Sequence, residues 1–247
     1  MPFEAGASLF LFLYSWPVPE SCDIAIIGAG AAGLMAAIAA GRARGHPHVP
    51  RGAPHRIIAL DSARKLGAKI LVAGGGRCNV THDVVDETAY AGSSRNAIRK
   101  VLGRFTVTDT VQFFKDQGVE LKREATGKLF PTTDNAHSVL NALLSAAREA
   151  GVEFRHSYRV ECIEHADVGF LITPPPAPQL PVLDPHPSIL ARRIILATGG
   201  QSLPKSGSDG HGYALAKSLG HTITRTLPAL VPLTLSQSLF LTQLSGI

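Results

Sequence analysis

The stretch DIAIIGAGAAGLMAA, residues 23–37, constrains the fold of this chain more strongly than any other part of the sequence. An apolar run that ends in glycine comes directly before a segment of strong helix formers, which predicts a buried parallel strand followed by a helix. The junction fits the pattern G-x-G-x-x-G, and its residues are Gly28, Ala29, Gly30, Ala31, Ala32 and Gly33. In this context the pattern predicts a turn that holds the diphosphate of a dinucleotide at the helix N-terminus. The alternative is a glycine-rich turn that binds no ligand.

Each glycine of this turn has an expected task. Gly28 permits the tight turn, and Gly30 lets a diphosphate approach the main chain. Gly33 lets the helix pack closely on the strand. The turn is therefore expected to serve both the fold and the ligand.

An acidic residue should end the second strand and bind a ribose hydroxyl. The apolar run RIIALD, residues 56–61, predicts that strand and ends at Asp61. The connection is lengthened by a loop at 43–55, rich in Pro, Gly, His and Arg, which is interpreted as a basic loop rather than a metal site. An acid at this position disfavours a 2′-phosphate, which leaves FAD or NAD as the expected nucleotide. The alternative is that Asp61 is an ordinary surface acid.

The rest of the chain alternates between predicted helices and predicted strands. Helices with Ser, Thr, Asp or Asn capping residues are expected at 93–105, 108–118 and 134–151. Strands are expected at 152–164, 169–173 and 192–200, with a proline-rich loop at 174–190. This alternation predicts an α/β Rossmann-type domain with a doubly wound parallel sheet and a small additional β-sheet.

A second glycine cluster favours FAD over NAD. The stretch GAKILVAGGGRCNVTHD, residues 67–83, contains three successive glycines, Gly74, Gly75 and Gly76. Bare main chain at this point would lie against a flat ring system or a diphosphate, and Asn79 would supply hydrogen bonds. The strand at 192–200 ends in Thr198, Gly199 and Gly200, at the edge where ligands collect in such sheets.

Arg77 and Cys78 follow the three glycines and leave alternatives open. Arg77 would stabilise negative charge on a reduced flavin, or it would form an ion pair that braces the loop. Cys78 would have a lowered pKa beside this arginine, although a small packed side chain is favoured because no second cysteine lies near in sequence. No general acid or base is assigned.

These motifs resemble the BaiN/YhiN-like flavoproteins, a family of aminoacetone-oxidase-type FAD-binding enzymes and NAD(P)/FAD-dependent oxidoreductases. The resemblance rests on DIAIIGAGAAGLMAA, KLGAKILVAGGGRCNVTHD, GKLFP, ILATGGQSLPKSGSDGHGYALAKSLGH and PALVPLTL. It implies an FAD-dependent oxidoreductase with NAD(P)H as the expected electron donor and a small-molecule substrate. The alternative functions are a flavoprotein of RNA modification and a non-catalytic fragment.

The resemblance also implies a role for each matched residue. Gly28, Gly30 and Gly33 would hold the diphosphate, and Asp61 the adenosine ribose. Residues from Lys69 to Asn79 would line the ribityl chain and the flavin. Val160 would offer backbone hydrogen bonds to adenine, and the turn at 198–200 would mark the strand that returns under the cofactor.

The expected domain organisation is incomplete relative to that family. Residues 1–21 are interpreted as an N-terminal extension, 22–235 as the FAD-binding domain, and 236–247 as the start of a β-rich domain that the chain lacks. The 43–55 and 174–190 loops are interpreted as insertions. The apolar stretch at 8–16 is too short to span a membrane, and no lysine or arginine precedes it.

Composition sets the expected partners and compartment. Three widely spaced cysteines predict no disulfide framework and favour a reducing cytoplasm. Sixteen of the 24 lysines and arginines lie within 42–128, against eight acidic residues. Because this basic region contains no run with interleaved aromatics, a phosphate-bearing cofactor is favoured over nucleic acid. No membrane partner is expected.

Overall fold

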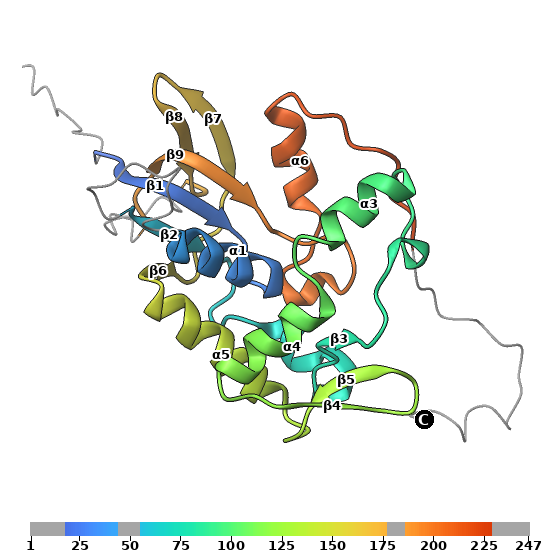
Figure 1. Cartoon of the computed structure of the whole chain (residues 1–247). Coiled ribbons are helices and arrows are strands. Elements are labelled where there is room, and N and C mark those ends of the chain that lie inside the picture. The colour runs from blue at the N-terminus through green and yellow to red at the C-terminus, as the bar shows by residue number, and fades with distance from the viewer. Residues whose placement is uncertain (1–17, 44–54, 177–185, 229–247) are drawn as a thin grey trace, which may run out of the picture.

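The computed structural model describes residues 18–43, 55–176 and 186–228 (Figure 1). The 43–55 and 174–190 insertions, most of the N-terminal extension and the segment 236–247 therefore lie largely or wholly outside the described residues. The elements are β1 Glu20–Ile27, α1 Ala31–Arg42, β2 Ile57–Leu60, α2 Ala68–Val72, η1 Ala73–Gly76, β3 Thr81–His82, η2 Glu87–Ala89, α3 Arg95–Leu102, α4 Val107–Asp116, β4 Leu121–Arg123, β5 Lys128–Pro131, α5 Ala136–Glu149, β6 Val152–Arg155, β7 Cys162–Ala166, β8 Gly169–Thr173, β9 Ile189–Leu196, η3 Pro204–Ser206 and α6 His211–Ser218.

The main sheet has six strands in the order β6-β2-β1-β9-β8-β7. The first four are parallel, and the hairpin of β7 and β8 adds two antiparallel strands beside β9. A second sheet of three antiparallel strands has the order β3-β5-β4. The predicted α/β architecture with a parallel sheet and a small additional sheet is thus confirmed.

Both faces of the main sheet are covered, as parallel strands require. On one face Ile26 and Ala59 pack under α1 and α5, which are neighbours in Figure 1. The same core continues to Phe113 and Phe114 of α4, which lies toward the small sheet. On the other face Ala25 and Ile58 pack against α6 and the segment that follows β6. Alternate residues of β1 and β2 therefore contribute to two separate cores.

The predicted strand at 152–164 is divided in the structure. Residues 152–155 form β6 at one edge of the sheet, whereas 162–166 form β7 at the opposite edge. Ser157 lies between them with a φ of 55°, which breaks the extended chain. The sequence pattern concealed this break because the alternation of apolar and polar residues continues through Tyr158. Tyr158 is 2% exposed and belongs to the core beneath the sheet, although it is not part of a strand.

The predicted Ser cap of α3 and Asn cap of α5 are present, whereas α4 is capped by Thr106, which lies before the predicted segment 108–118. Ser94 accepts a hydrogen bond from the N–H of Ala97 at the start of α3, and Thr106 forms a capping box with Asp109 at α4. Within the predicted segment 134–151, Asn135 is the cap of α5, because its side chain accepts from the N–H of His137. Each cap satisfies an amide that the helix leaves unpaired.

Gly33 is required for the fold, and Gly30 provides a matched control on the same turn. A Cβ at Gly33 would lie 1.8 Å from the carbonyl oxygen of Gly28, whereas one at Gly30 would meet no atom within 4 Å. We expect Gly33→Ala to lower the free energy of unfolding by about 3 kcal/mol or more, at the upper end of overpacking effects. Gly30→Ala is expected to melt within a few degrees of the wild type. Equal melting of the two variants in thermal denaturation would contradict this packing.

Candidate functional site

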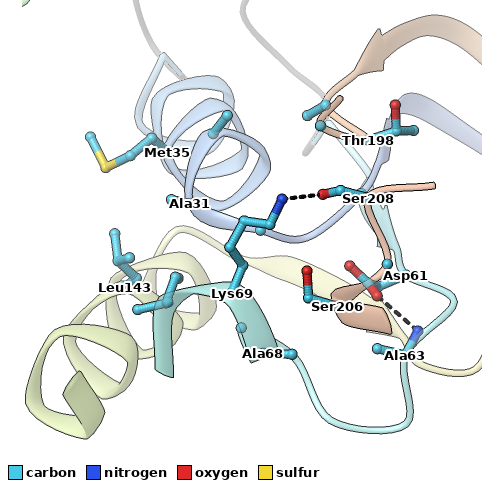
Figure 2. A pocket seen from close by; sticks show the side chains of 18 of the residues that line it. Ala31, Met35, Asp61, Ala63, Ala68, Lys69, Leu143, Thr198, Ser206 and Ser208 are labelled. Carbon is cyan, nitrogen blue, oxygen red and sulfur yellow. Dashed lines mark hydrogen bonds between the residues drawn. The ribbon is translucent and has the colours of Figure 1, made fainter. Parts of the chain in front are cut away.

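A cavity of about 810 Å³ opens where the carboxyl ends of β1, β2 and β9 meet α1, α2, α5 and the loop before α6 (Figure 2). Its volume lies within the range of about 300–1,000 Å³ that is common for small-molecule sites. Eleven of the predicted residues line it: Gly28, Gly30, Ala31, Ala32, Asp61, Lys69, Cys78, Asn79, Val160, Thr198 and Gly199. The other seven lie outside the lining: Ala29, Gly33, Gly74, Gly75, Gly76, Arg77 and Gly200. The predicted strand ends thus lie together around one cavity. Cofactor binding by these residues stays a prediction.

The glycine turn leaves the N-terminus of α1 open to this cavity. Gly28 has a φ of 97°, and Gly30 is the N-cap residue, which offers no side chain to the first amides of the helix. The first turn of α1 contains no acidic residue. Free amides and the positive end of the helix dipole therefore face the cavity, which is an arrangement that attracts an anion.

The Asp61 carboxylate is held by main-chain amides. Its Oδ2 accepts from the N–H of Ala29 at 2.7 Å, and its Oδ1 accepts from the N–H of Ala63 at 2.8 Å. Asp61 therefore ties the end of β2 to the glycine turn. Each carboxylate oxygen can accept a second hydrogen bond, so Asp61 has acceptor capacity for a ribose hydroxyl.

The end of β9 packs against the loop before α6. Gly199 has a φ of 77°, and a Cβ there would lie 2.6 Å from Ser208 Oγ. Thr198 lines the cavity, and its hydroxyl lies where a side chain at Gly212 of α6 would stand. Gly200 turns away toward Tyr213. Glycines here permit a close approach of two main-chain segments at the cavity wall.

The three successive glycines form a left-handed turn beside the cavity. Gly74, Gly75 and Gly76 have φ values of 57°, 68° and 86°, a region that side chains rarely adopt. A Cβ at Gly74 would lie 2.8 Å from the ring of Phe130. The turn positions Cys78 and Asn79, which do line the cavity. The glycines are thus explained by backbone conformation and by the small sheet, and a ligand contact to them stays a prediction.

The Arg77 side chain packs against the small sheet. Its guanidinium is 4.1 Å from the ring centre of Phe130 and donates to Glu124 at 2.5 Å, with Asp134 at 3.7 Å. These contacts match the alternative in which Arg77 braces the loop. A role of its charge at a reduced flavin has no geometric support in the cavity lining.

Cys78 is a buried thiol in a left-handed conformation, with a φ of 63°. Burial raises the pKa of this thiol above its usual value. The direction is opposite to the one that a reactive thiolate needs, which supports the interpretation of a packed side chain.

The segment after β6 lines another wall of the cavity, where the resemblance placed adenine. The Val160 carbonyl accepts a hydrogen bond from His211 Nε2 at 3.1 Å. Beside it Arg159 donates to Asp209 at 2.7 Å. The pKa of Asp209 is lowered first by the backbone N–H of His211 and then by Arg159.

Lys69 spans the cavity from α2 to the loop before α6 (Figure 2). Its ammonium donates to the Ser202 carbonyl at 2.7 Å and to Ser208 Oγ at 2.6 Å. Ser208 is 6% exposed, and among the described residues it is the one polar residue that is buried. Lys69 therefore joins two segments that are 139 positions apart in the sequence.

Sequence reasoning missed the apolar part of the lining. Met35, Phe113, Phe114 and Leu143 all border the cavity from α1, α4 and α5, and in Figure 2 Met35 and Leu143 lie away from Asp61. Their helical spacing is that of ordinary core residues, so the sequence held no signal that separates a cavity wall from a core. The segment from Ser206 to His211 was also missed, because serines and glycines after a strand are typical of any loop.

The comparisons with known proteins identify the family. The profile described as HI0933-like protein Rossmann domain matches residues 22–237. The chain belongs to this family. The resemblance that the motifs indicated is thereby confirmed.

Two curated relatives have different enzyme names. The chain is 38% identical over 210 residues to the 3-dehydro-bile acid delta(4,6)-reductase of Clostridium scindens, covering 85% of this chain and 47% of that protein. It is 31% identical over 221 residues to the ribosomal RNA dihydrouridine synthase of Escherichia coli, covering 89% and 50%. The chain thus spans about half the length of the curated relatives it matches.

Solved structures show the same fold at low identity. A 3-ketosteroid-delta4-(5alpha)-dehydrogenase of Rhodococcus jostii RHA1 matches with a TM-score of 0.57 and 18% identity, over 85% of this chain and 55% of that one. An open flavocytochrome c3 fumarate reductase matches with a TM-score of 0.53 and 20% identity, over 81% and 41%. Among the described residues no helix has the length and apolar character needed to cross a bilayer.

The contacts of Arg77 predict a structural effect when it is replaced. We expect Arg77→Gln to lower the thermal midpoint of unfolding, because the ring contact with Phe130 and the ion pair with Glu124 are lost. Loss of the ring contact alone is expected to lower the free energy of unfolding by about 0.5–2 kcal/mol. Nucleotide affinity is expected to stay at the wild-type value. Titration of both proteins with FAD checks the second part, and a large loss of affinity at unchanged stability would instead assign Arg77 to the ligand.

Proposed function

We propose that this chain is the FAD-binding part of a FAD-dependent oxidoreductase. The observation that carries the proposal is the combination within one cavity of bare, uncapped main chain at Gly28–Gly33 and an apolar wall from α1, α4 and α5. An FAD molecule needs the first for its diphosphate and the second for its ring system. NAD carries the same diphosphate but a smaller, single-ring nicotinamide, so an extended apolar wall favours the flavin nucleotide.

The residues present fit this cofactor. Gly30 lines the cavity, and the space at its Cβ position is open for at least 4 Å, so a phosphate has room against the main chain there. Asp61 would bind the adenosine ribose, and the backbone of Val160 would bind adenine. Cys78 and Asn79 would border the ribityl chain and the flavin, and Lys69 would also contact the cofactor. The turn at 198–200 would close the cavity from β9.

The bound flavin would supply hydride transfer, and the protein would hold it and exclude water. Met35, Phe113 and Leu143 would provide the dry wall for this purpose. NAD(P)H is the proposed electron donor and a small organic molecule the proposed substrate. The relatives' names, a bile acid reductase and an RNA dihydrouridine synthase, support reduction of an unsaturated ring as the general reaction.

A second candidate function is reduction of a base in RNA. Relatives in Escherichia coli and Haemophilus influenzae are named ribosomal RNA dihydrouridine synthase, at 31% and 28% identity. Helix α3 presents the exposed cations Arg95 and Lys100, and it is followed by Phe105, which lines the cavity. RNA affinity that falls steeply as salt rises, and that Lys100→Gln weakens, would favour this function. Salt-independent or absent binding would oppose it.

Flavin binding is tested directly on the purified chain. We expect the flavin absorption bands in the protein as isolated or after addition of FAD, with release of FAD on denaturation. A colourless protein that takes up no FAD and melts without cooperativity would instead support a non-catalytic fragment.

Gly30→Val tests where the nucleotide lies. The valine side chain would project into the open space beside the helix N-terminus, so we expect the variant to fold and to lose FAD by at least about tenfold in affinity. Thermal melting controls for folding. Wild-type FAD affinity in this variant would show that the nucleotide binds elsewhere.

A further inference from the structure

Lys69 is the cation of the cavity that lacks a carboxylate partner. Four residues with charged side chains line the cavity, Asp61, Lys69, Arg159 and Asp209. Arg159 and Asp209 neutralise each other, and Asp61 is held by two amides. Lys69 has bonds to neutral oxygens, and within the described part of the chain it forms no ion pair.

The position of this cation follows from a chain of contacts to the glycine turn. A Cβ at Gly28 would lie 2.9 Å from Thr198 Cα, so the glycine turn lies directly against the end of β9. Gly199 follows Thr198, and a Cβ at Gly199 would lie 2.6 Å from Ser208 Oγ. Ser208 Oγ in turn accepts from Lys69 Nζ at 2.6 Å. Figure 2 shows the Lys69 side chain extended from α2 toward the start of α1 at Ala31. The ammonium and the uncapped helix N-terminus therefore face the same part of the cavity.

We propose that Lys69 is the counter-ion of the diphosphate of a bound nucleotide. This rests on the proposed FAD-binding function and deepens it, since it assigns Lys69 to the diphosphate and not to the ribityl chain or the flavin. An ammonium has three N–H donors. Two donate to the Ser202 carbonyl and to Ser208 Oγ, which fixes the side chain across the cavity. The third has a long contact of 3.4 Å with the Ser202 hydroxyl, which a phosphate oxygen would replace.

The physical advantage of this arrangement is that the charge is positioned before the ligand arrives. A free lysine side chain loses rotamer freedom when it binds an anion, whereas Lys69 is already fixed by the Ser202 carbonyl and the Ser208 hydroxyl. Neutral oxygens hold the ammonium without cancelling its charge. A diphosphate would thus meet a positioned cation on one side and helix amides on the other.

The test compares three probes on the whole chain: FAD, ADP and riboflavin. ADP carries the diphosphate without the flavin, and riboflavin carries the ring system without phosphate. We expect Lys69→Met to weaken FAD and ADP by about tenfold or more and to leave riboflavin unchanged. Lys69→Arg is expected to retain most of the affinity, and the gap between wild type and Lys69→Met is expected to narrow as salt rises.

Lys65→Met is the matched control, because Lys65 is exposed on the same segment and does not line the cavity. It is expected to bind all three probes as the wild type does. Ser208→Ala is expected to give an intermediate loss of ADP affinity, because the Ser202 carbonyl still holds the ammonium. Thermal melting of every variant separates lost affinity from lost folding.

The outcomes distinguish this inference from the proposed function. Unchanged affinity for ADP in Lys69→Met would overturn the inference, and if riboflavin alone were lost the lysine would be placed at the flavin. Equal loss of riboflavin and ADP would indicate a general change of the cavity and would also overturn the inference. A wild-type protein that binds ADP but not FAD would remove the flavin function, while a Lys69 effect on ADP would still support the diphosphate contact. A wild-type protein that binds neither would overturn both.

Discussion

The structure depends on one place where three main-chain segments come too close for any side chain. A Cβ at Gly33 would lie 1.8 Å from the Gly28 carbonyl, and a Cβ at Gly28 would lie 2.5 Å from the Ala197 carbonyl. The end of β1, the start of α1 and the end of β9 are therefore held in direct contact. This contact aims the helix N-terminus at the cavity. It also brings the turn after β9 beside the glycine turn, so the packing of the fold and the shape of the site have the same cause.

The sequence predicted the parts of the fold that depend on local chemistry. The helix 31–42, the caps at Ser94 and Asn135, and the two central strands follow from helix propensity, capping and apolar runs. The positions of the strand ends at the cavity were also predictable, because a glycine after an apolar run indicates that another main-chain segment or a ligand approaches closely there. Family membership rested on the same motifs and is confirmed.

Other parts depend on contacts between distant segments and could not be predicted. The break between β6 and β7 is determined by which edge of the sheet each half joins, and the alternating sequence pattern is the same for one long strand. The capture of the Asp61 carboxylate by the N–H of Ala29, and that of Lys69 by Ser208, need three-dimensional coordinates. The structural need at Gly74–Gly76, three left-handed residues beside the ring of Phe130, also depends on the fold, and the predicted ligand contact of these glycines stays a prediction.

The pairing of β1 with β9 has a consequence for how the chain acquires its structure. These two strands lie side by side at the centre of the sheet, with Glu20 opposite Ile189 and Ile27 opposite Leu196. During synthesis the ribosome must release nearly the whole described sequence before the second of them is available. Closing so long a segment is slow, because ordering entropy is lost before distant contacts form. Until then the backbone N–H and C=O groups along one edge of β1 have no partner strand, which exposes the nascent chain to aggregation.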